Sequence, residues 1–188
     1  MLSRLETEAD FPQNKTFAQS NLMKCYYDIK DYLNSVVYAE KVLENPKTDS
    51  NVKSDAQIII ARAAMQTGDD TKARTAYAKL RSIGKGELAA EALYYDAYFK
   101  NKDSKFEESN TAVQKLAKNY SSYKYFGAKG LILMAKNFYG LKDSFQATYI
   151  LDNIIQNFTD FPEVVTEAQT ELATIKAEEA KTNSSITN

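Results

Sequence analysis

Few side chains in this sequence are of a type that could do chemistry, and none is well placed for it. The chain has no His and a single cysteine, Cys25, so it lacks the commonest general base and every Ser-His or Cys-His nucleophile pair. The segment Gly84-Lys85-Gly86 lacks the remainder of either nucleotide-binding fingerprint. Asp69-Asp70 lacks the spaced ligands and the late Glu of a calcium loop. We therefore expect no enzymatic activity, no bound metal and no cofactor.

The charged side chains are numerous but balanced. Lys and Arg number 24 and Asp and Glu number 25, which gives a formal net charge of -1. A near-neutral chain gives no electrostatic reason to bind DNA, RNA or an anionic membrane. Nucleic-acid binding is therefore only a weak third hypothesis for the function, after the two given at the end of this section. Asp69 or Asp70 is instead expected to cap a helix. Cys25, with Met23 and Tyr26 near it, is expected to be a buried, inert thiol.

The spacing of apolar residues predicts helices throughout. Pro12, Pro46 and Pro162 fall between helical patterns, where proline is tolerated. Between these breaks, apolar residues recur every three or four positions, which indicates amphipathic helices. No apolar segment approaches the ~20 residues of a membrane helix, so no transmembrane segment is expected. The sequence therefore predicts an all-α fold.

The helices are predicted to come in pairs that repeat along the chain. A short polar turn recurs at Asp31, Asp69, Lys105 and Asp143, at intervals of 38, 36 and 38 residues. Repetition at this scale is typical of helical-repeat proteins. The prediction is a single domain over residues 1–181, followed by a polar, loose tail at 182–188. Its parts are repeats at about 14–46, 51–83, 87–119 and 123–158, and an end helix at 162–181 with an apolar stripe of Val165, Ala168, Leu172 and Ile175.

Small residues mark where the paired helices are expected to cross. After the turns these are Ser35, Ala73, Ser109 and Ala147, and before the turns they are Ala61, Ala97 and Ala135, with Met23 as the bulky exception. Small side chains allow helix axes to approach closely. Gly130 is expected to serve another close approach, and Gly127 to mark a late helix start.

Two longer segments carry a resemblance to a known family. Tyr26 to Tyr32 followed by Ala39 to Pro46, and Thr67 to Tyr77, resemble tetratricopeptide repeats (TPR). The likeness covers about four repeats, from Phe17 to Phe158, and implies a right-handed α-solenoid of four helical hairpins with flanking end helices. Residues 90–95 and 128–135 are similar to envelope TPR proteins of Gram-negative bacteria. These include large Bacteroidetes proteins and relatives of the cell-division coordinator and the outer-membrane assembly lipoprotein.

The resemblance also implies a binding surface and a departure from the family. First helices of TPR pairs line a concave groove, which by this likeness holds Lys24, Tyr27, Arg62, Tyr94, Tyr98, Lys136 and Tyr139. Its three cations are expected to attract an acidic protein or peptide, and its Tyr and Arg are residue types enriched at binding hot spots. Asp96 and Lys100 stand where the family has apolar residues, and we expect them to pair with each other.

The sequence therefore favours a scaffold or adaptor that binds a protein or peptide in its groove. The alternative is a structural spacer within a larger multi-repeat cell-envelope protein. Residues 1–10 look like the last turns of an amphipathic helix, with Leu2 and Leu5 on one face, so the chain is expected to begin inside a longer protein. A signal peptide upstream would place it in the periplasm. Tyr123, Tyr125 and Phe126 form a second candidate interface.

Overall fold

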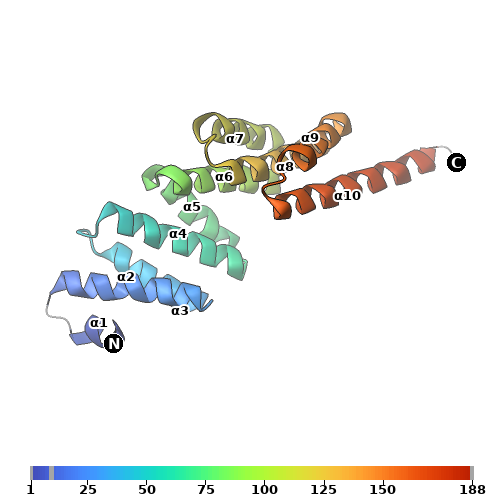
Figure 1. Cartoon of the computed structure of the whole chain (residues 1–188). Helices are drawn as coiled ribbons and strands as arrows, with labels where there is room; N and C mark the ends of the chain where they lie inside the picture. The colour runs from blue at the N-terminus through green and yellow to red at the C-terminus, as the bar shows by residue number, and fades with distance from the viewer. Residues whose placement is uncertain (1, 9–10, 187–188) are drawn as a thin grey trace. The chain divides into compact units, whose positions relative to one another are not determined.

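The computed structural model describes residues 2–8 and 11–186, and in these ranges the chain folds into helices without strands (Figure 1). The prediction of an all-α fold is confirmed. The helices are α1 Leu2–Glu8, α2 Pro12–Asp28, α3 Tyr32–Glu44, α4 Ser50–Thr67, α5 Asp70–Ile83, α6 Gly86–Lys102, α7 Phe106–Asn119, α8 Lys124–Gly140, α9 Ser144–Asn157 and α10 Pro162–Ile186.

The chain divides into two compact units, and the boundary falls inside α6 between Ala92 and Leu93. In unit 1, α1 packs on α2, α2 on α3, α3 on α4, and α4 on α5. In unit 2, α7 packs on α8, α8 on α9, and both α8 and α9 pack on α10. We call α2, α4, α6 and α8 the first helices of their pairs, and α3, α5, α7 and α9 the second helices.

The turn inside each helix pair has the same backbone conformation in all four pairs. One residue adopts a left-handed φ, namely 62° at Lys30, 74° at Gly68, 58° at Ser104 and 69° at Lys142. The next amide N–H then donates to a carbonyl five residues earlier, as from Asp31 to Tyr26 at 2.8 Å and from Asp143 to Phe138 at 2.9 Å. This is the Schellman arrangement, which satisfies carbonyls at a helix end. The turns predicted from sequence lie at these four positions.

The residue after each left-handed position also starts the second helix. The Asp31, Asp69 and Asp143 carboxylates accept from the backbone N–H three residues on, at 3.2, 2.9 and 3.0 Å. Such N-caps satisfy a donor that the helix itself leaves unpaired. The predicted capping role of Asp69 is confirmed. In the third pair the equivalent residue is Lys105, whose side chain makes no capping hydrogen bond.

Because only Gly68 among the four left-handed residues lacks a Cβ, the other turns are strained. We expect Lys142→Gly to raise the free energy of unfolding by about 1 kcal/mol, since a left-handed φ costs an L-residue roughly 1–2 kcal/mol. The midpoint of urea unfolding measures this. Lys142→Ala is the matched control, because it removes the same charge but keeps the Cβ. If Ala and Gly stabilise equally, the gain comes from the charge and the strain argument is wrong.

The predicted crossing positions between paired helices are fully buried. Ala61, Ala97 and Ala135 on the first helices have no exposed surface, and the same holds for Met23. On the second helices the buried positions are Ser35, Ala73, Ser109 and Ala147. Both serines reach across the crossing, with the Ser35 hydroxyl donating to the Met23 carbonyl at 3.1 Å and the Ser109 hydroxyl to that of Ala97 at 2.8 Å. The small side chains therefore set close contact between paired helices.

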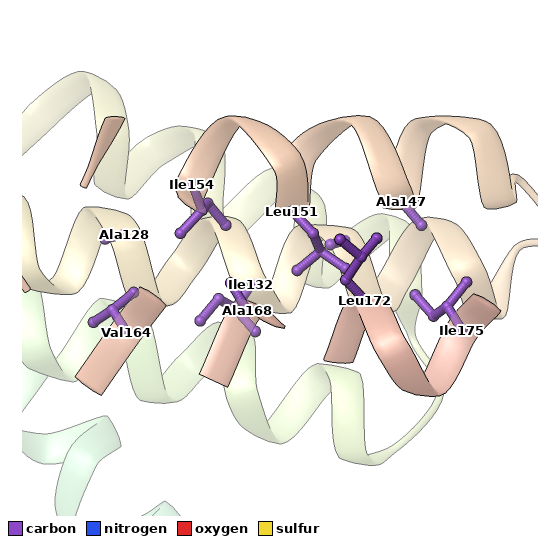
Figure 2. Close-up of a cluster of buried hydrophobic side chains, with 10 residues drawn as sticks. Ala128, Ile132, Ala147, Leu151, Ile154, Val164, Ala168, Leu172 and Ile175 are labelled. Atoms are coloured by element: carbon purple, nitrogen blue, oxygen red, sulfur yellow. The ribbon is translucent and has the colours of Figure 1, made fainter. Parts of the chain in front are cut away.

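Helix α10 closes the core of unit 2. Figure 2 shows Val164, Ala168 and Leu172 of α10 directed toward Ile132 of α8 and Leu151 and Ile154 of α9. The buried stripe begins at Val164, whereas the sequence predicted Val165, which is half-buried. Pro162 starts the helix, as expected for a residue without an amide N–H. The helix continues to Ile186, so the expected loose tail from Thr182 is helical that far; residues 187–188 lie outside the described ranges.

A buried polar network joins three helices of unit 2. The Asn137 amide, which has no exposed surface, donates to Ser109 Oγ at 2.9 Å and to Asn110 Oδ1 at 2.8 Å. Its oxygen accepts from Asn101 Nδ2 at 2.8 Å. Because a buried amide without partners is costly, these bonds favour the observed register of α8 against α6 and α7. The predicted pair of Asp96 and Lys100 also forms, at 3.1 Å.

Gly127 and Gly130 of α8 have different surroundings. A Cβ at Gly130 would lie 3.2 Å from Val113 Cγ1 and 3.3 Å from Leu116 Cδ2, so the predicted close helix approach is confirmed. A Cβ at Gly127 would meet no atom within 4 Å. Gly127 lies inside the first turn of a helix that starts at Lys124, so the expectation of a late helix start is wrong.

Candidate protein-interaction surfaces

In unit 1, each candidate groove cation is paired with a carboxylate on the next first helix. Lys24 Nζ on α2 lies 2.6 Å from Asp55 Oδ2 on α4. Arg62 on α4 holds Glu91 on α6 through two parallel bonds, Nε to Oε1 at 2.9 Å and Nη2 to Oε2 at 2.5 Å. The two pairs connect successive first helices along the chain.

The pair of Arg62 and Glu91 is the more buried of the two. The Glu91 side chain is only 4% exposed, and its Oε1 also accepts from the Tyr77 hydroxyl at 3.0 Å. Hydrogen bonds to the Glu91 carboxylate raise the pKa of Arg62 well above its ordinary value. Two-point contacts of this kind are specific to the planar guanidinium. Arg62 therefore has a structural partner within the chain, which the sequence interpretation did not foresee.

Tyr27 lies on the same first-helix face of unit 1, one turn after Lys24. Its ring meets the ring of Tyr32 edge-on, with centroids 5.7 Å apart. It is half-buried, and burial raises the pKa of its hydroxyl. The ring is therefore held in place while part of its surface faces solvent.

In unit 2, the cations of α8 are paired in the same way. Lys136 Nζ lies 3.1 Å from Glu171 Oε2 on α10, and Lys129 pairs with Glu167 on the same helix. The Tyr139 hydroxyl donates to Glu178 Oε2 at 2.8 Å, and this bond raises the pKa of Tyr139. All three contacts join α8 to α10. The expected cations Lys24, Arg62 and Lys136 are thus each balanced by a carboxylate of the chain, and a surface of uncompensated positive charge is not found at them.

The two groove candidates on α6 in unit 2 differ in exposure. Tyr94 is only 7% exposed and packs against Tyr95 and Phe126, with ring centroids 5.0 and 6.0 Å away. Burial raises its pKa, and the side chain presents almost no surface to a partner. Tyr98 is half-buried and makes edge contacts with Tyr95 at 5.8 Å and Phe99 at 5.3 Å. Tyr98 therefore presents a positioned aromatic surface, whereas Tyr94 is buried.

The structure also shows apolar surface that the sequence interpretation missed. Ile29, Leu33 and Val37 in the first pair are exposed, and so are Leu141, Phe145 and Tyr149 in the fourth. Leu33 is 77% exposed and Phe145 is 74% exposed. We call these two sets the apolar triads. The two triads occupy the same three positions when each pair is numbered from the left-handed residue of its turn. At these positions the second pair has Thr67, Thr71 and Thr75, and the third pair has Asp103, Glu107 and Thr111.

Two smaller expectations about side-chain exposure are corrected. Cys25 is exposed on α2 rather than buried. In the second candidate interface, Phe126 is buried and packs on Tyr94, so it contributes no surface. Tyr125 is exposed and lies edge-on to Phe161, with centroids 5.9 Å apart. A helical period places neighbouring residues on different faces, which explains why Tyr125 and Phe126 differ.

Within residues 2–8 and 11–186, no group of three or more Cys, Asp or Glu side chains is arranged to hold a metal ion. Within the same ranges no helix has the length and apolar character needed to span a bilayer. Every buried side-chain nitrogen and oxygen of the described residues has a hydrogen-bond partner.

No family model matches the chain, and no curated protein matches its sequence.

Proposed function

We propose that this chain is a TPR-type right-handed solenoid that binds a peptide or a partner domain on the surface of its first helices. Support comes from four helix pairs that share one turn conformation and from small residues buried at each crossing. The TPR resemblance adds the expectation that first helices line the binding groove. The function is non-enzymatic scaffolding or adaptation.

The observation that carries this proposal is the position of Tyr98. It stands where the other three first helices have the paired cations Lys24, Arg62 and Lys136. Its ring is half-exposed and held edge-on by Tyr95 and Phe99. A tyrosine held in this way loses little conformational entropy on binding and offers both apolar area and a hydroxyl. Such residues are enriched at binding hot spots.

The paired cations change the kind of partner proposed. A surface with alternating charges does not select strongly for acidic partners, as a row of free cations would. We propose that the partner presents an apolar side chain to Tyr98. Its polar groups then face the ion pair of Lys136 and Glu171, and Tyr139 beside them on α8. A peptide with both features fits better than a uniformly acidic one.

Selection of peptides from a random dodecamer display library on the immobilised chain tests this function. We expect enriched peptides whose binding weakens by about 2 kcal/mol, roughly thirtyfold in Kd, in Tyr98→Ala. Tyr149→Ala is the matched control, because Tyr149 is an exposed tyrosine on a second helix, and it should leave Kd unchanged. Peptides that lose affinity in Tyr149→Ala but not in Tyr98→Ala would contradict the proposal.

One observation favours the alternative of a structural spacer in a larger multi-repeat cell-envelope protein. The cations of the first-helix surface each hold a carboxylate two helices further along the chain, as in Arg62 with Glu91 and Lys136 with Glu171. Contacts of this kind stiffen a stack of helix pairs without any partner. A spacer predicts that the same library yields no peptide above background on the wild-type chain.

A further inference from the structure

A cleft in unit 2 has none of the candidate groove residues in its lining. It has a volume of about 390 Å³ and opens where the end of α7, the start of α8 and the loop after α9 meet. Its walls are mainly apolar, formed by Val113, Ala117, Leu131, Phe158 and Phe161, with Tyr120 at one side. Pockets that hold small groups in proteins have volumes of ~300–1,000 Å³ and similar walls.

Gly127 lines this cleft, and the fold gives no reason for a glycine there. A Cβ at Gly127 would meet no atom within 4 Å. The equivalent fourth residues of α4, α6 and α10 are Lys53, Ala89 and Val165, so a side chain suits this position in a helix. Glycine lowers helix stability relative to Ala. What Gly127 does is leave the space in front of it open.

We propose that the cleft at Gly127 is an anchor pocket that takes one aromatic side chain, Trp or Phe, from a partner protein. Tyr120, Phe158 and Phe161 supply three rings for edge or offset contacts, which favour an aromatic over an aliphatic group. At the rim, Lys124, Asp160 and Asn157 offer charges of both signs and an amide to the polar backbone around the anchor. Exposed Tyr125, against Phe161, continues the apolar surface beyond the mouth.

A protein side chain as occupant rests on the proposal that this chain binds proteins, but the site is separate from Tyr98. Buried aromatic anchors in pockets carry much of the binding energy at protein interfaces. The cleft can therefore bind its anchor even if the library yields no peptide that depends on Tyr98. A peptide can equally bind at Tyr98 while the cleft stays empty, so the two experiments can fail independently.

Titration of the isotopically labelled chain with short peptides, followed by amide NMR shifts, tests the pocket. The probe is acetyl-Ala-Ala-Trp-Ala-Ala-amide, and the comparison is the same peptide with Leu in place of Trp. We expect saturable shifts within residues 113–131 and 157–161 for the Trp peptide, and clearly weaker ones for the Leu peptide. Equal shifts for both peptides, or shifts spread over both units, would overturn the aromatic anchor.

Two variants of Gly127 make the test specific. Gly127→Leu fills the cleft, so saturable binding should be lost while the helical spectrum remains. Gly127→Ala leaves most of the volume and should retain binding, with Tm higher by about 2–4 °C because alanine favours the helix. Undiminished binding to Gly127→Leu would refute the pocket. If free indole binds the cleft but the Trp peptide does not, a protein partner is refuted as the occupant.

Discussion

Arg62→Ala is expected to lower the free energy of unfolding by about 3 kcal/mol. The change leaves the Glu91 carboxylate, only 4% exposed, without its cation, although the Tyr77 hydroxyl still donates to it. Removing one partner of a buried pair costs roughly 3–5 kcal/mol. The lower end applies because the Arg62 side chain is 42% exposed, so water can reach the carboxylate once it is gone. Urea unfolding followed by circular dichroism measures the loss.

Two further variants separate the buried charge from lost packing. Adding Glu91→Gln to Arg62→Ala removes the unpaired charge, so the double variant should be more stable than Arg62→Ala alone. Lys24→Ala breaks the equivalent pair with Asp55, in which both side chains are 40% or more exposed, and should cost less than about 1 kcal/mol. A double variant no more stable than Arg62→Ala would show that the unpaired carboxylate is not the cause.

In unit 2, Asn137→Leu is expected to lower the free energy of unfolding by a similar amount, about 3 kcal/mol. The leucine has the same branching but no polar atoms, so it leaves Asn110 Oδ1 without the Asn137 donor and the Asn101 amide without its acceptor. Each buried polar group left unpaired costs roughly 1–3 kcal/mol. Asn101 is half-buried, so water can replace part of its loss. Thermal and urea unfolding give the change.

The matched control for Asn137 is Asn153→Ala on α9. The Asn153 amide donates to the Tyr149 carbonyl of its own helix at 2.8 Å, and this contact is at the surface. Its removal should change the free energy of unfolding by less than about 0.5 kcal/mol. If Asn137→Leu is as mild as this control, then the buried network does not hold α6, α7 and α8 in register.

Local features of the fold were predictable from the sequence because local rules determine them. The four turns follow from polar residues at regular spacing, and the crossing positions follow from small side chains such as Ala61 and Ser109. Asp69 as a cap and Asp96 paired with Lys100 are contacts within four residues, which helix geometry fixes. In each case the partner lies nearby in the chain.

The candidate surfaces were harder to predict because their partners are distant in sequence. Arg62 and Glu91 are 29 residues apart, and no local pattern shows that their side chains meet. Tyr94 and Tyr98 are four residues apart on α6, a spacing that places both on one helix face. Their different burial therefore depends on how the neighbouring helices pack. The apolar triads could have been found by aligning the four pairs on their turns, because Leu33 and Phe145 then stand where Thr71 and Glu107 are polar.

Hydrogen exchange of the chain, with and without a peptide selected from the library, tests whether a partner binds the first-helix surface. Binding there predicts slower exchange in α6 and α8, which hold Tyr98 and Tyr139, with α7 and α9 unchanged. Protection confined to the second helices, or to the segments of the apolar triads, would contradict it.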